Sequence, residues 1–375
     1  MQIIPSSTII CNFTTTCLMY EILGSAYILG APSSHLEKIY EDESRSLEPW
    51  SDSPGEVSIE DWRDHLGDPR YQRAYVDFFE DQLVQAGYDW KQVLNKFLFE
   101  GKEPLFNNLI SGLGHCLIHL GYAYELDSRE ISMEALGLTT CFYGPLHKYI
   151  DDPAYSKASS APSSFAKPSS STLEILMRIR DDSRFDDIPN HKRAISLEEL
   201  FETHEAALLE HWNSWQLPQP RAQFEESQAT PTSLLVGSYN KDGSKDYDFF
   251  LVHLLTTSHA VRILLPIIPP KLHVTLVKQW WLFVVAVYII QGRPAVDRER
   301  FLKHDIGSKD WTWIDTEAKE GKWSLDAHFV KALRSMKVAA ETWEDEKHDN
   351  FYLKAAVKMV EEYNGWGGFG FMKEG

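Results

Sequence analysis

The stretch Ser111–Glu125, SGLGHCLIHLGYAYE, is an apolar run interrupted by two histidines, and it decides how the rest of the chain is interpreted. His115 and His119 are four residues apart, so on an α-helix they lie on one face, one turn above the other. Buried imidazoles need polar partners, because an unpaired buried polar group costs about 1–3 kcal/mol. The spacing fits either two core histidines bonded to backbone carbonyls or two ligands of one metal ion, such as zinc, iron, copper or nickel.

Apolar residues recur at helical spacing on both sides of this stretch, and no segment shows the sustained alternation of a strand. We expect helices over residues 18–29, 35–44, 58–66, 69–87, 90–99, 107–126, 132–149 (with a break at Gly144-Pro145), 172–180, 196–215, 246–265, 278–290, 324–342 and 350–363. Ser156–Ser171 is rich in Ser, Ala and Pro and lacks periodicity, which predicts a flexible loop. The sequence therefore predicts an all-α fold, with a single large multi-helix domain over residues 1–375 and residues 156–171 as its flexible insertion.

The composition limits the classes of partner. The chain has 375 residues and a formal net charge of −18, with no block of Lys or Arg, so we expect neither nucleic-acid nor membrane binding. Its most hydrophobic run, Trp280–Ile290, has eleven residues, too few to cross a bilayer, and is expected to be a buried helix. The four cysteines show no paired spacing and the start of the chain lacks a signal-peptide pattern, which predicts reduced thiols in a cytoplasmic protein.

Two further segments place titratable side chains among apolar residues of expected helices. His253 and His259 lie six residues apart in one of them, and each is either a ligand or a core histidine with a polar partner. His328 and Lys331 are three residues apart in DAHFVKALR and share a helix face. A lysine amine buried there loses its proton readily, and can then act as a base or react with CO2 to form an anionic carbamate ligand. The alternative is a lysine whose ammonium reaches solvent at the helix edge.

Motifs of several other enzyme classes do not occur in the sequence. It contains no GxGxxG after a strand, no P-loop, no GxSxG elbow and no HExxH. We therefore expect no dinucleotide-binding fold and no FAD.

Several segments, in a fixed order, give the chain a family resemblance. They are ILGAPSSHLEKIYEDE (Ile28–Glu43), GHCLIHLGYAYE (Gly114–Glu125), LEILMRIRDDSRFD (Leu173–Asp186), YDFFLVHLLTTSHAVRILLP (Tyr247–Pro266), YIIQGRP (Tyr288–Pro294) and DAHFVKALRSMKVAAETW (Asp326–Trp343). Together they resemble the questin oxidase-like family of fungal aromatic polyketide pathways, over about Leu18–Gly370.

The resemblance implies an O2-dependent oxygenase that opens a ring of an anthraquinone or related aromatic polyketide in a Baeyer–Villiger-type reaction. Its implied cofactors are a non-haem Fe(II) and, as electron donor, NADPH. The implied metal ligands are His115, His119, His253 and Lys331, the last as a carbamate, and the catalytic candidates are Lys331, His328 and His259.

One part of the family pattern is missing. Members carry histidines in an NHxxHH-like pattern in the helix before LGA, whereas Cys17–Ile22 stands there in this chain, with Glu21 as the candidate metal ligand. Either a carboxylate replaces the imidazole, or the first helix is not the ancestral one. The alternative function is a catalytically inactive helical protein that binds a polyketide or a partner.

Overall fold

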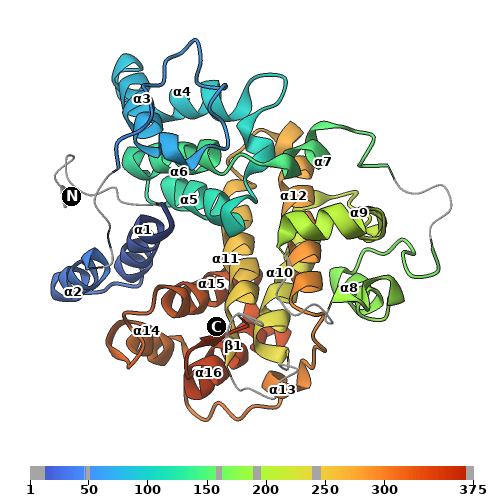
Figure 1. The fold of residues 1–375 in the computed structure, drawn as a ribbon. Coiled ribbons are helices and arrows are strands. Elements are labelled where there is room, and N and C mark those ends of the chain that lie inside the picture. The colour runs from blue at the N-terminus through green and yellow to red at the C-terminus, as the bar shows by residue number, and fades with distance from the viewer. Residues whose placement is uncertain are drawn as a thin grey trace. The chain divides into compact units, whose positions relative to one another are not determined.

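A computed structural model of the chain describes residues 13–45, 47, 51–157, 163–188, 196–238 and 246–368, and nearly all of its regular structure is helical (Figure 1). Among these residues one short parallel pair of strands forms, between β1 (Tyr247–Asp248) and β2 (Trp366–Gly367). The all-α prediction is therefore confirmed. The chain divides into two compact units, Met1–Gly144 with Asp315–Arg334 and Pro145–Ile314 with Ser335–Gly375. The assignment of residues 1–375 to a single domain stays a prediction.

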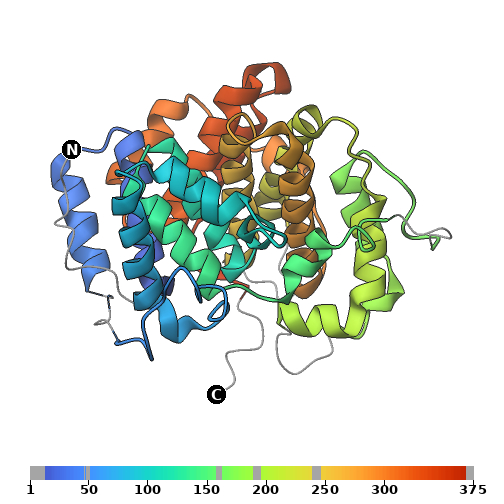
Figure 2. The same cartoon turned by 90° about the horizontal axis from the view of Figure 1, so that it is seen from above.

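The helices of the first unit pack around α5 and α6, which lie side by side (Figure 2). Helix α6 also contacts α3 and α4, and α1 packs against both α2 and α5. The bounds of these helices are α1 (Phe13–Ile28), α2 (Ser33–Ser44), α3 (Gln72–Gln85), α4 (Trp90–Leu94), α5 (His115–Glu125) and α6 (Arg129–Cys141), and α14 (Trp311–Glu320) and α15 (Ala327–Trp343) belong in part to each unit.

Helix α1 approaches α5 closely at Gly24. A Cβ at this position would lie 2.9 Å from Leu126 Cδ1 and 3.2 Å from Tyr122 Cδ1, so only glycine fits without displacement of a neighbour. The next residue, Ser25, shares a 2.6 Å hydrogen bond with the Tyr122 hydroxyl. This contact fixes the face of α1 that carries Glu21, one turn before Gly24, against α5.

Helix α5 begins later than predicted. The expected helix over 107–126 starts only at His115, and the preceding residues form 3₁₀ turns. Gly112, Leu113 and Gly114 have φ of 57°, 55° and 81°, the left-handed region that ends or interrupts an α-helix. His115 therefore occupies the first position of α5.

Other helix predictions fail in two ways. The helix expected over 58–66 is wrong, because Asp61 accepts hydrogen bonds from both the backbone N–H and the hydroxyl of Ser58 and the segment forms turns instead. Among the described residues, three helices were not predicted, α10 (Pro220–Gly237), α13 (Glu299–Leu302) and α14. The first contains Pro231 and many Ser and Thr residues, so its sequence shows no clear helical stripe of apolar residues.

The second unit is built around α12, which contains the most hydrophobic run of the chain. Its helices are α7 (Lys148–Asp151), α8 (Thr172–Arg180), α9 (Leu197–Ser214), α10, α11 (Phe249–Leu264), α12 (His273–Ile290), α13 (Glu299–Leu302) and α16 (Phe351–Glu362). Within the described segments, Pro270–Ile290 alone has the length and composition of a membrane span, yet 72% of its most apolar window is buried, as in the core helix of a folded domain. The prediction of a buried helix is confirmed, although the helix begins before Lys278.

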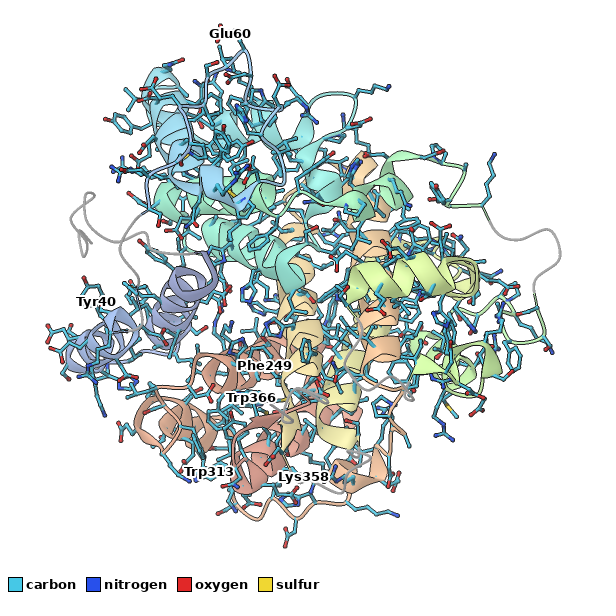
Figure 3. All side chains as sticks on the ribbon, viewed as in Figure 1. Tyr40, Glu60, Phe249, Trp313, Lys358 and Trp366 are labelled. Atoms are coloured by element: carbon cyan, nitrogen blue, oxygen red, sulfur yellow. The ribbon has the colours of Figure 1, made fainter. Side chains whose placement is uncertain are left out.

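The aromatic side chains of this unit pack mainly into its core. Trp280 and Trp281 are fully buried, and Trp280 lies 5.0 Å from Phe224 between ring centroids. Their complete burial makes both tryptophans core residues of this unit. Near the surface, Phe249 of α11 packs edge to face on Trp366 of β2, with centroids 6.3 Å apart (Figure 3).

The predicted flexible segment 156–171 is described only in part. Residues 158–162 lie outside the described residues, whereas Ser169 pairs with the chain after α9 through backbone hydrogen bonds of 3.0 Å and 2.9 Å. Cys116 and Cys141 are both buried thiols, as expected, while Cys11 and the side chain of Cys17 lie outside the described residues.

Candidate functional site

The first unit contains a buried polar cluster centred on Glu21 of α1. The Glu21 Oε1 atom lies 3.1 Å from Nδ1 of His115 and 3.1 Å from Nδ1 of His119, both on α5. Its Oε2 atom pairs with Nζ of Lys331 on α15. The side chains of Glu21, His119 and Lys331 are at most 1% exposed. The structure thus brings together four of the residues that the sequence singled out as metal ligands.

The cations and hydrogen bonds around Glu21 determine its charge. Burial alone would raise the pKa of the Glu21 carboxyl, but Lys331 and His115 hold it well below its usual range. Burial lowers the pKa of His115, although Glu21 opposes the shift. Near neutral pH the cluster therefore contains a carboxylate beside a neutral imidazole at His115.

His119 lies between two carboxyl groups. Its Nδ1 faces Glu21, and its Nε2 lies 3.7 Å from Oε2 of Glu134 on α6. Burial raises the pKa of Glu134, which His119 partly opposes. Glu134 was not predicted, although an acidic residue in the apolar segment ISMEALGL of α6 indicates that a buried polar partner must exist.

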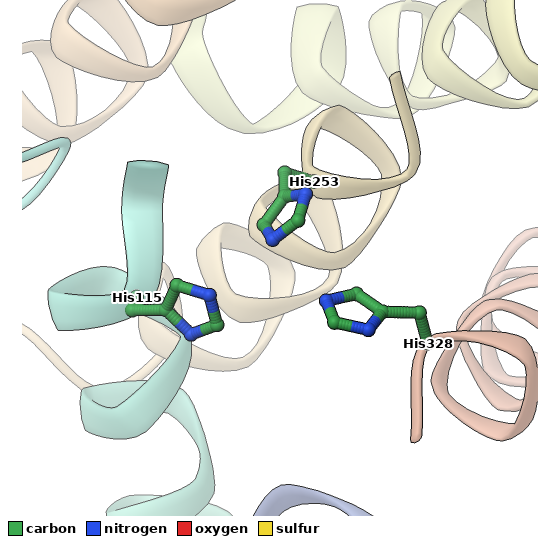
Figure 4. Close-up of side chains that lie close together, drawn as sticks. All are labelled: His115, His253 and His328. Atoms are coloured by element: carbon green, nitrogen blue, oxygen red, sulfur yellow. The ribbon is translucent and has the colours of Figure 1, made fainter. Parts of the chain in front are cut away.

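His328 of α15 is the second imidazole near His115. Nitrogen atoms of His115 and His328 lie within 4.8 Å of each other, and the two rings face one another from α5 and α15 (Figure 4). A metal ion bonded to two imidazoles at about 2.1 Å brings the nitrogens within about 4.2 Å. A small side-chain adjustment would therefore let these two residues hold one ion. His328 is 5% exposed.

The donor set at His115 fits a metal ligand. Metal-bound histidines commonly donate their second ring N–H to a carboxylate or a carbonyl, which fixes the ring and the tautomer. Nδ1 of His115 faces the Glu21 carboxylate, so its N–H donates there and Nε2 keeps a lone pair. Within the first unit, His115 belongs to two groups of possible metal ligands. One group also contains Glu21 and His119, and the other also contains His328.

His253 and His259 belong to the second unit, and His253 is the third side chain labelled in Figure 4. Nδ1 of His253 donates to the Phe249 carbonyl at 2.8 Å, so Nε2 carries a lone pair. Nδ1 of His259 lies 3.4 Å from Nη2 of Arg262. The ligand role of His253 and the catalytic role of His259 stay predictions.

A second buried network supports the helices of the cluster. Arg334 of α15, whose side chain is 1% exposed, pairs with Glu125 and lies 5.2 Å above the ring of Tyr122 on α5. Tyr122 in turn bonds Ser25 of α1. The network connects the three helices that carry Glu21, the histidine pair and Lys331. Its residues were not predicted, because their pairing depends on tertiary contacts.

Known proteins resemble this chain over most of its length. The questin oxidase-like family matches residues 19–336, a span that includes every residue of the cluster. A Baeyer–Villiger oxidase of Pestalotiopsis microspora, GME11358, is 23% identical over 283 residues, which are 70% of this chain and 61% of that protein.

Two shorter matches have similar descriptions. A Baeyer–Villiger oxidase of Paecilomyces divaricatus, AgnL3, is 40% identical over 68 residues, 17% of this chain and 14% of that protein. The oxidoreductase AflY of Aspergillus parasiticus is 29% identical over 127 residues, 32% of this chain and 25% of that protein. The chain thus spans at most 61% of the length of these relatives. Because the family match covers most of the chain, the protein belongs to the questin oxidase-like family.

Proposed function

We propose that the protein is an O2-dependent oxidoreductase that oxygenates and opens a ring of an aromatic polyketide, with an anthraquinone as the substrate class. Family membership and the descriptions of two relatives as Baeyer–Villiger oxidases support the reaction type. The observation that carries the proposal is the buried cluster of His115, His119, Glu21 and Lys331, with His328 next to His115.

The proposed metal is Fe(II), held by His115 and His328. Bound iron would supply a redox centre and a Lewis acid for O2 and for the oxygens of the substrate. His253 is retained as a further ligand on the family resemblance, which its hydrogen bond to the Phe249 carbonyl supports. NADPH as electron donor and a cytoplasmic location are parts of the proposal that rest on the sequence alone.

The residues around His115 have a defined task in this proposal. Glu21 accepts the Nδ1 proton of His115 and so keeps the lone pair on Nε2. Burial lowers the pKa of His115, which keeps the imidazole neutral and able to coordinate. Glu134 and Glu21 hold His119 from both sides.

Metal analysis tests the proposal directly. Full-length protein purified without chelator should contain about one Fe(II) per chain after anaerobic loading, and should consume O2 when an anthraquinone is added. His115→Ala and His328→Ala should each lose most of the metal, whereas His304→Ala, which removes an imidazole paired with Glu361 in the second unit, should retain it. Stoichiometric metal in the His115→Ala/His328→Ala double variant would refute the ligand assignment.

A second candidate function has one observation in its favour. Glu21 stands where the resemblance places histidines, so the chain can have kept the fold and lost the reaction. In that case the protein would bind an anthraquinone but would not consume O2, whether or not it is loaded with iron. Calorimetric binding together with an oxygen-electrode trace distinguishes the two functions.

A further inference from the structure

The pairing of Lys331 with Glu21 gives Lys331 a role that the sequence did not suggest. Both side chains are 1% exposed, and Nζ of Lys331 contacts Oε2 of Glu21 directly. The residues are 310 positions apart in the chain, so only the packing of α1 against the rest of the unit creates the contact.

This contact disfavours a carbamate at Lys331. A carbamate forms when the neutral amine adds CO2 and releases a proton, and the product carries a negative charge. At Lys331 that charge would lie against the carboxylate of Glu21, and unless a metal ion is bonded to both groups the two like charges repel strongly in a buried, low-dielectric site. An ammonium at the same position is attracted to Glu21 and satisfies one of its oxygens.

The other oxygen of Glu21 acts on His115. Oε1 lies 3.1 Å from Nδ1 of His115 and accepts its N–H. A neutral imidazole that carries its proton on Nδ1 presents an unprotonated Nε2. The carboxylate thereby determines which nitrogen of His115 can meet a metal ion.

We propose that Glu21 and Lys331 form a fixed ion pair that positions His115, in which Lys331 is the counter-ion of Glu21 and neither residue is a metal ligand. The carboxylate accepts the Nδ1 proton of His115, and its partner cation keeps it in place behind the imidazole. The inference rests on the proposed function only for the presence of a metal on His115, since the pairing and the tautomer exist in metal-free protein.

The pairing is measured by a double-mutant cycle on full-length, metal-free protein. We expect Lys331→Met to lower the denaturation midpoint strongly, because it leaves a buried carboxylate without its cation. The double variant Glu21→Gln/Lys331→Met should recover most of that loss, since it removes both charges of the pair. Losses that simply add in the double variant would overturn the pairing.

Whether the Lys331 amine carries a carbamate is measured on the wild-type protein, so this test does not require a variant to fold. Metal-free protein and protein loaded with diamagnetic Zn(II), both equilibrated with carbon-13-labelled bicarbonate, should show no carbamate carbon resonance, and removal of CO2 should leave the metal content of the loaded protein unchanged. A carbamate resonance that disappears in Lys331→Met would overturn the inference.

The positioning role is measured by the tautomer of His115. In metal-free protein labelled with nitrogen-15 histidine, assigned by comparison with His115→Ala, the proton should reside on Nδ1. Glu21→Gln/Lys331→Met keeps an accepting oxygen and should keep this tautomer, whereas Glu21→Met/Lys331→Met should lose it and bind Fe(II) about 10–100-fold more weakly. An unchanged tautomer in the second variant would overturn the role of Glu21. If wild-type protein binds no metal, the proposed function fails, but the cycle and the tautomer still decide this inference.

Discussion

The two units each bury a carboxylate against a histidine, but the two clusters differ in where their partners come from. In the second unit, Asp182 accepts hydrogen bonds from the backbone and the guanidinium of Arg184 and from Nε2 of His211 at 2.8 Å. Asp182 is fully buried, yet its cation is only two residues away and 36% exposed. In the first unit, the cation paired with Glu21 is 310 residues away and 1% exposed.

This difference separates a structural cluster from a candidate site. Asp182 caps the 3₁₀ turn Ser183–Phe185, and Arg293 donates to backbone carbonyls of the same loop, so the second cluster fixes a local backbone conformation. Within the described residues, Glu21 contacts the side chains of His115 and His119 on α5 and of Lys331 on α15. Glu21 is therefore the stronger candidate for a functional role, because its pKa is shifted inside a buried cluster of titratable side chains from other helices.

The largest expected effect on the free energy of unfolding comes from removing the cation of each cluster, Lys331 in the first unit and Arg184 in the second. Lys331→Met should destabilise the protein by about 3–5 kcal/mol, because it leaves Glu21 charged and buried. Arg184→Met should cost less, since the Arg184 backbone N–H and His211 still bond Asp182 and the removed guanidinium is partly in water. Guanidinium chloride denaturation at about pH 7 measures both. A larger loss in Arg184→Met would reverse the comparison.

The close approach of α1 to α5 should be the next most sensitive feature. Gly24→Val places a Cβ 2.9 Å from Leu126 Cδ1 and 3.2 Å from Tyr122 Cδ1, and its two methyl groups crowd the Tyr122 ring that Ser25 holds by a hydrogen bond. It should cost about 1–3 kcal/mol through overpacking. A displacement of α1 by this crowding should also weaken Fe(II) binding, since it would carry Glu21 away from His115. Gly55→Val is the control, because a Cβ at Gly55 meets nothing closer than 4.0 Å. Equal stability of the two variants would show that α1 is not held by this contact.

The hydrogen bond between Ser25 and Tyr122 should have a smaller effect. Tyr122→Phe leaves the buried hydroxyl of Ser25 without this partner and should cost about 1–2 kcal/mol. Tyr27→Phe, at a side chain of the same helix that is 52% exposed, should change stability little. Thermal unfolding of the two variants, compared with the wild type, gives the difference.

The smallest expected effect is a pH dependence at Glu43 of α2. Burial, with Asp42 nearby, raises the pKa of Glu43 to about 7, so the folded protein binds this proton more tightly than the unfolded chain. The contribution of Glu43 to the free energy of unfolding therefore falls as the pH rises from about 4.5 towards 7. Glu21, whose pKa is depressed, has the opposite sign, and its stabilisation is lost only as pH falls below the usual range of a carboxyl.

The variant Glu43→Gln isolates this effect. It should raise the unfolding temperature at about pH 8 and leave it nearly unchanged at about pH 5, where Glu43 is protonated in the folded protein. Calorimetric scans at the two pH values provide the measurement, and an equal rise at both would assign the gain to packing instead of charge.

The helices and the chemistry of the cluster were largely predictable from the sequence. Four-residue spacing put His115 and His119 on one face, and the apolar surroundings of Lys331 made a buried amine one of two alternatives. The start of α5 was not predicted, because the left-handed conformations at Gly112 and Gly114 depend on backbone geometry that the apolar pattern does not reveal. The missing helix α10 has the same cause, a periodicity hidden by proline and hydroxyl side chains.

By itself the sequence determined an all-α protein with His115 and His119 on one face of a helix, because helical periodicity is a property of short segments. It left open whether Lys331 is buried or reaches solvent, and the structure shows it buried. Only the tertiary structure decided that Glu21 is the partner of Lys331 and that Glu134 faces His119. Such pairs join residues far apart in the chain, and a buried charge specifies only that it needs a partner, not which helix provides it.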